Sequence, residues 1–222
     1  MAKHIAHEIE KLKRQILELA ALVEEAVARS VAAFSDRDAA LGQQIIEADD
    51  RIDVMEVDVE EECLKLLALY QPVAQDLRFI VACFRLNSDL ERIGDLAVNI
   101  AEQAVYLSGV PAPSVRPLDV GAFAKHVRAM LSGALDGFVN MDAGTARRVC
   151  AADDEADRMH RDTFTRVEEA VRRYPAEFAV LTHYLSVSRY LERIADHATN
   201  IAEDVIYMVE GEIVRHREPT ER

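Results

Sequence analysis

The chain has little of what sheet proteins and disulfide-bonded proteins need. Its 222 residues include only 8 Gly, 6 Pro and 3 Cys, and no Trp. So few turn-forming residues, beside long tracts of Ala, Leu, Glu, Arg and Val, favour an all-α protein over a sheet protein. The cysteines Cys63, Cys83 and Cys150 are odd in number, widely spaced and embedded in helical patterns. We therefore expect no disulfide framework and a protein that resides in a reducing compartment.

Long apolar runs and positive charge are scarce as well. No stretch approaches about 18 uninterrupted apolar residues, and the N-terminal sequence MAKHIAHEIEKLKRQ lacks the apolar core of a signal peptide. We therefore expect a cytoplasmic protein without direct membrane insertion. Only 26 Lys and Arg oppose 40 Asp and Glu, which gives a formal net charge of −14. Because this charge would repel a nucleic-acid backbone or an anionic membrane, cations and basic protein surfaces remain as partners.

One string of residues, in contrast, is present twice. Residues 90–106 read LERIGDLAVNIAEQAVY and residues 191–207 read LERIADHATNIAEDVIY, with 11 of 17 aligned positions identical. The offset between the two copies is 101 residues throughout. Two unrelated amphipathic helices would not share so many positions, so the chain is an internal duplication.

Prolines and apolar spacing divide the duplicated chain into helices. The segment LSGVPAPSVRPLDVG loses helical periodicity, which predicts a Pro-rich linker at residues 111–118. Apolar residues recur at threes and fours on both sides of it. The predicted helices cover residues 3–34, 38–70, 72–108, 119–140, 142–174 and 175–213. The predicted fold is therefore all-α, a tandem duplication of an antiparallel three-helix bundle. Its parts are a first repeat at 1–110, a second at 119–213 and a polar tail at 214–222.

Acidic and amide side chains follow one face of the repeated helix. At 100° per residue they fall within an arc of about 80°, away from the apolar side that carries Ile93, Ala97 and Ile100. The stripe is therefore presented along the side of the helix rather than inside the bundle. Its members are Glu91, Asp95, Asn99 and Glu102 in the first repeat, and Glu192, Asp196, Asn200 and Glu203 in the second.

The preceding helix of each repeat adds a further pair of carboxylates. The pairs are Asp49 and Asp53 in the first repeat, and Asp153 and Asp157 in the second. Asp53 lies 19 residues before Pro72 and Glu91 lies 19 after it, so the two stand at equal height in an antiparallel hairpin. Asp157 and Glu192 lie 18 before and 17 after Pro175. The spacing thus predicts four converging carboxylates in each half.

The two carboxylate pairs and both stripes, with Asn99, Glu102, Asn200 and Glu203 included, are therefore the predicted metal ligands. Oxygen ligands at this spacing suit divalent or trivalent metal ions such as Fe, Mn, Mg or Zn. His160, three residues after Asp157, could join the second site. The alternative is a metal-free acidic helical scaffold that docks a basic protein partner, and a merely solvated acidic face is the simplest explanation of a single stripe. Metal analysis of the purified protein separates these hypotheses.

Catalytic constellations are missing from the sequence. It has no Ser, His and Asp set, no Gly-rich phosphate loop and no Cys cluster, so we expect no enzyme. A carboxylate-bridged di-iron oxidase is also disfavoured. Such enzymes place Glu and Glu-x-x-His ligands inside a four-helix core, whereas Glu91 and Asp95 face away from the apolar side of their helix.

The repeated strings in their wider context resemble a known family. YQPVAQDLRFIVACFRLNSDLERIGDLAVNIAE and LERIADHATNIAEDVIYMVEG are similar to the PhoU family of phosphate-specific transport accessory proteins, and the resemblance covers nearly the whole chain. It implies a duplicated three-helix bundle with metal at the acidic motif pairs. It also implies a negative regulator that acts between the phosphate ABC transporter and its sensor histidine kinase, at the inner face of the membrane. A homodimer is compatible with the resemblance.

Overall fold

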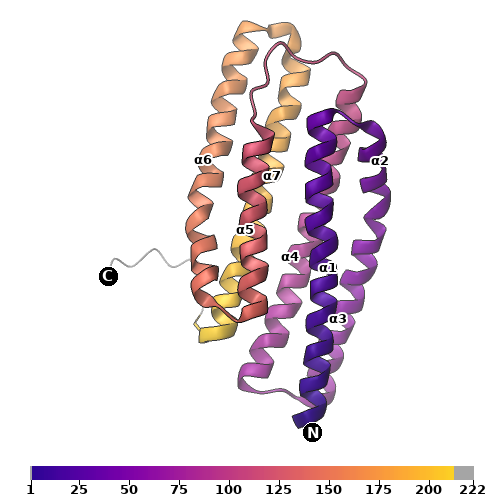
Figure 1. Cartoon of the computed structure of the whole chain (residues 1–222), viewed down its shortest axis with the longest axis vertical. Helices are drawn as coiled ribbons and strands as arrows, with labels where there is room; N and C mark the ends of the chain where they lie inside the picture. The colour runs from indigo at the N-terminus through magenta and orange to yellow at the C-terminus, as the bar shows by residue number, and fades with distance from the viewer. Residues whose placement is uncertain (1, 213–222) are drawn as a thin grey trace, which may run out of the picture.

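The computed structural model describes residues 2–212, and within them it contains helices but no strand (Figure 1). The elements are α1 Ala2–Asp36, α2 Ala39–Ala48, α3 Asp50–Tyr70, α4 Ala74–Ser108, α5 Val120–Asn140, α6 Ala143–Arg173, the short 3-10 helix η1 Pro175–Glu177, and α7 Phe178–Glu210. This confirms the predicted all-α fold. No helix between residues 2 and 212 combines the length and the apolarity needed to cross a bilayer. The predicted polar tail at 214–222 lies outside the described residues.

The helix predicted over residues 38–70 is interrupted at Asp49, which separates α2 from α3. Asp49 keeps helical backbone angles, φ −65° and ψ −36°, but its N–H donates to the Ile46 carbonyl, three residues back, at 3.5 Å. The regular spacing of four residues resumes where the Asp53 N–H donates to the Asp49 carbonyl at 3.2 Å. In the second half α6 is continuous through the corresponding region. The first half therefore has a corner that the second half lacks.

The repeated helices α4 and α7 pack against each other in the middle of the molecule (Figure 1). Arg85 Nη1 lies 3.1 Å from Asp204 Oδ1 near one end of this contact, and His183 Nδ1 lies 2.6 Å from Gln103 Oε1 near the other. Residue numbers rise along α4 as they fall along α7, so the two helices are antiparallel. The duplicated halves are thereby related by an approximate two-fold rotation.

One large apolar core runs through both halves, and a small separate cluster of Val167, Ala170 and Leu181 lies between α6 and α7. On α4 the side chains predicted to face inward, Ile93, Ala97 and Ile100, have no exposed surface. The matching residues Ile194 and Ala198 of α7 are equally buried. Burying these faces removes apolar surface from water, which is the main favourable term in folding. The same burial leaves the acidic faces of α4 and α7 pointing away from the core.

Helix α2 approaches α4 closely at Gly42. A Cβ added there would lie 2.8 Å from Val105 Cγ2 and 3.0 Å from the carbonyl oxygen of Ala101. Because a helix backbone cannot move aside cheaply, Gly42→Ala should lower the free energy of unfolding by a net ~1 kcal/mol, the overpacking cost exceeding the better helix propensity of Ala. Gly121→Ala is the control, since its added Cβ meets only Asp119 Oδ1 at 3.7 Å. Equal urea-unfolding midpoints for the two variants would contradict the close contact.

Candidate functional site

The first acidic group consists of four carboxylates, one at the break between α2 and α3 and three on the helices α3 and α4. Asp49 lies at the corner between α2 and α3, and α3 and α4 carry the rest, Asp53, Glu91 and Asp95. The corner can approach α4 because residue 94 is glycine. A Cβ on Gly94 would lie 3.3 Å from the Ile52 side chain and 3.5 Å from Asp49 Oδ1. The repeated residue in α7 is Ala195, opposite a helix without a corner.

The carboxylates of the first acidic group act on one another electrostatically. Burial, followed by the negative charges of Asp53, Asp95 and Glu91, raises the pKa of Asp49 from 3.8 to about 6. Burial and the charge of Asp95 also raise the pKa of Glu91, while Arg92 opposes this. Side chains so affected stand close together in space. The equal distances of Asp53 and Glu91 from Pro72 predict such an interaction, because the two residues stand at one height in the hairpin.

The second acidic group, between α6 and α7, has the same arrangement. Burial and then the charge of Asp196 raise the pKa of Asp153. Burial and then the charge of Asp157 raise the pKa of Glu192, and burial and then Glu192 raise that of Asp196. Asp196 therefore lies within electrostatic range of Asp153, Glu192 and Asp157, and Glu192 within range of Asp157. The distances to Pro175 predict the pairs Asp153 with Asp196 and Asp157 with Glu192.

Cationic and hydroxyl groups already contact these carboxylates. Arg92 bridges the first group, 3.4 Å from Glu91 and 3.3 Å from Asp95. In the second group Arg161 lies 3.2 Å from Asp157, and the hydroxyl of Thr199 donates to Asp153 at 3.2 Å. Within the described chain no three His, Cys, Asp or Glu side chains converge closely enough to hold one ion. The donors have the oxygen chemistry that hard cations prefer, but binding would require Arg92 and Arg161 to swing away. Both are mostly exposed, so that movement costs little.

The C-terminal residues of the two predicted stripes lie outside the two acidic groups. Asn200 Nδ2 donates to Asp89 Oδ1 at 3.3 Å across the α4–α7 contact, where His197 Nδ1 also approaches Asp89 at 2.7 Å. Glu203 lies beside Cys150, and burial followed by its charge raises the pKa of that thiol to about 11. In α4, Asn99 is half-buried and Glu102 is exposed.

His160, a candidate for the second group, contacts another partner. Its Nδ1 lies 2.9 Å from the hydroxyl of Ser188, a buried residue of α7. Burial and the charge of Arg189 lower the pKa of His160, which favours the neutral ring. The hydrogen bond to Ser188 fixes the ring between α6 and α7 instead of directing it at the carboxylates.

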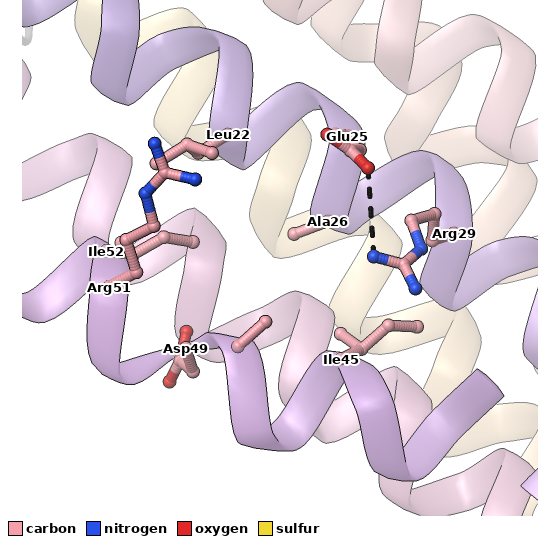
Figure 2. Close-up of a pocket in the computed structure, with 9 residues that line it drawn as sticks. Leu22, Glu25, Ala26, Arg29, Ile45, Asp49, Arg51 and Ile52 are labelled. Atoms are coloured by element: carbon pink, nitrogen blue, oxygen red, sulfur yellow. Dashed lines mark ion pairs between the residues drawn. The ribbon is translucent and has the colours of Figure 1, made fainter. Parts of the chain in front are cut away.

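A small pocket lies between α1 and the α2–α3 corner (Figure 2). It encloses about 150 Å³, with Leu22, Ala26, Ile45 and Ile52 as its apolar lining. Arg29 and Glu25 form an ion pair of 3.7 Å at one side, and Asp49 stands at the corner. Sequence reasoning did not find this pocket because it assumed an unbroken helix over residues 38–70. One sequence difference that accompanies it is Gly94 in place of Ala195.

Both halves of the chain match one known domain. The match is to the PhoU domain, at residues 16–104 and 121–205. The chain is 37% identical to the phosphate-specific transport system accessory protein PhoU homolog of Aquifex aeolicus (strain VF5), over 97% of either chain. The fold is similar to the crystal structure of PhoU from Pseudomonas aeruginosa, with a TM-score of 0.90 and 37% identity over 93% of this chain and 99% of that one. It is also similar to the crystal structure of the phosphate transport system regulatory protein PhoU from Streptococcus pneumoniae, with a TM-score of 0.84 and 28% identity over 95% and 99% of the two chains.

Proposed function

The chain belongs to the PhoU family, and from this premise we propose that it is a non-enzymatic accessory protein that regulates phosphate uptake. The observation that carries the proposal is the match of both halves to the PhoU domain. The relative from Aquifex aeolicus is named as a phosphate-specific transport system accessory protein, and it is similar over nearly its whole length. In this role the protein is a negative regulator between the phosphate ABC transporter and its sensor histidine kinase, on the inner side of the membrane.

The two acidic groups are the proposed metal sites. Asp49, Asp53, Glu91 and Asp95 would hold metal in the first half, and Asp153, Asp157, Glu192 and Asp196 in the second. Burial and then mutual repulsion raise the carboxyl pKa values, and a bound divalent or trivalent cation would supply the positive charge that offsets the repulsion. Each group joins two helices of one hairpin. Cation binding would therefore hold the α2–α3 corner against α4, and α6 against α7, so that metal sets the rigidity of the surface offered to partners.

A metal-free acidic scaffold is the second candidate, and one observation favours it. Arg92 already bridges Glu91 and Asp95, so the first group is partly neutralised without an ion. A basic side chain of a partner protein could take the place of Arg92 in the same way. Elemental analysis of the protein purified without chelator separates the two candidates. Only the metal-binding protein should contain a fixed number of metal ions per chain, with the same number in each acidic group.

Deleting the gene for this protein in its host should raise the expression of phosphate-uptake genes in phosphate-rich medium. The reason is that a negative regulator is needed to keep these genes off when phosphate is plentiful. Transcript levels before and after deletion measure the effect, and a plasmid-borne copy of the wild-type gene should reverse it. Unchanged expression in phosphate-rich medium would refute the proposed regulation.

A further inference from the structure

The outer face of α3 carries an exposed row of apolar side chains, which we call the α3 stripe: Val54, Val57, Leu64 and Ala68. Val54, Val57 and Leu64 expose 61%, 52% and 50% of their surface, and Ala68 is also exposed. On a helix these four positions fall within an arc of about 80° and span roughly 21 Å. Glu61 falls within the same arc, between Val57 and Leu64. The α3 stripe is therefore an apolar ridge with one carboxylate near its centre, and exposed apolar surface of this extent marks interaction sites in soluble proteins.

The second half of the chain provides an internal comparison. Aligning Asp49 and Asp53 with Asp153 and Asp157 places four charged residues of α6 at the positions of the α3 stripe, namely Arg158, Arg161, Glu168 and Arg172. All four form ion pairs along α6, with Glu155, Asp157 and each other. The same face of the same fold is thus solvated on α6 and apolar on α3. Since α6 folds with charged residues at these four positions, folding does not explain the α3 stripe.

Carboxylates lie within the α3 stripe, at Glu61, and at both of its edges, where the edge toward α1 also carries Lys65 in an ion pair with Glu62. Toward α1 lies a hollow of about 540 Å³, whose lining includes Asp58, Glu61 and Gln15. Asp58 and Glu61 form no ion pair within residues 2–212, and the buried Oε1 of Gln15 has no hydrogen-bond partner there. The opposite edge carries Glu60. An apolar ridge between acidic edges is complementary to a surface that is apolar in the middle and basic at its edges.

From this complementarity we propose that the α3 stripe docks an amphipathic helix of a partner protein that carries Lys or Arg along both edges of its apolar face. A helix fits because the α3 stripe is a straight ridge at spacings of three and four, which packs into the grooves of another helix. Lys or Arg side chains of the partner would reach Asp58, Glu61 and the Gln15 oxygen. A second copy of this chain is a poorer occupant, because two-fold pairing of α3 with α3 would bring acidic edges together. The proposal uses residues outside the two acidic groups and holds whether or not these bind metal.

Two synthetic helical peptides test the proposal on the full-length protein. Both have about 18 residues, enough to cover the α3 stripe, and share one Leu face. One has Lys at the flanking positions and the other has Glu. Fluorescence anisotropy should show saturable binding of the Lys peptide, at least about tenfold tighter than that of the Glu peptide. Equal affinity for the two peptides would overturn the charge argument.

Matched variants test whether the apolar ridge itself is recognised. Leu64→Gln and Val57→Gln should each weaken binding of the Lys peptide by about tenfold. Phe164→Gln is the control, because Phe164 is an equally exposed apolar residue, 55%, on α6. All three positions are on the surface, so folding should persist, and thermal melting checks this. Unchanged affinity in the two α3 variants overturns the proposal. A change of solution mass from dimer to monomer in the same two variants would also overturn it, because it would identify a second copy as the occupant.

Discussion

Asp53→Asn and Glu91→Gln should each remove metal binding from the first acidic group and leave the second group intact. Each substitution keeps the size of the side chain and its fit in the helix, but it removes one anionic ligand. The metal content of the full-length protein should therefore fall to that of one group. At a free metal concentration about 100 times the dissociation constant, a site contributes roughly 2.7 kcal/mol to folding. The melting temperature of each variant should accordingly respond much less to metal than that of the wild type.

The controls for these variants lie on the same helix. Asp58→Asn and Glu61→Gln make the same chemical changes on the side of α3 next to α1, away from Glu91 and Asp95. Both should keep the full metal content, measured by elemental analysis after dialysis, and the full response of the melting temperature to chelator. If Asp53→Asn and Glu91→Gln also retained wild-type stoichiometry, the four carboxylates would not form a metal site.

In the presence of chelator, the protein should become less stable as the pH rises from about 4 to about 6. Burial and neighbouring carboxylates raise the pKa of Asp49 from 3.8 to about 6, so over this range the folded chain holds a proton that the unfolded chain has released. The stability that this proton provides is fully present below the pKa of Asp49 in the unfolded chain, and it is lost as the pH rises through the pKa in the folded chain. Screening around the half-exposed side chain reduces the contribution to ~1 kcal/mol. The raised pKa values of Glu91, Asp153, Glu192 and Asp196 add to the loss.

Asp49→Asn isolates this effect. The variant should be more stable than the wild type near pH 7 without metal, and the difference should shrink toward pH 4, as measured by urea unfolding across the pH range. Asp58→Asn, an exposed carboxylate on α3, should leave the pH dependence unchanged. With metal present, the wild type should instead become more stable as the pH rises, because protons compete with the ion for the carboxylates. A variant no more stable than the wild type at pH 7 would show that Asp49 is not under electrostatic strain.

The sequence by itself determined the all-α fold and the duplication, and it predicted the pairing of the acidic residues. The helix predicted over residues 38–70 is the exception, because the break at Asp49 divides it. Helical periodicity is a local property, so the spacing of Ile93, Ala97 and Ile100 was enough to predict the buried side of α4. Equal distances from Pro72 placed Asp53 level with Glu91, because both helices of the hairpin have the same rise per residue. The charges that raise the pKa of Glu91 include that of Asp53, in agreement with this level pairing.

Only the tertiary structure decided how the elements meet. The packing of α4 on α7 turns Asn200 toward Asp89, and no local pattern could predict a partner 111 residues away. The corner at Asp49 depends on the space that Gly94 leaves on a different helix. Val57 and Leu64 have the spacing of core residues, yet they lie outside because α3 buries another face, with Ile52, Val59 and Cys63, against its neighbours. Periodicity shows that a helix has an apolar face, but which face is covered depends on the helices that pack against it.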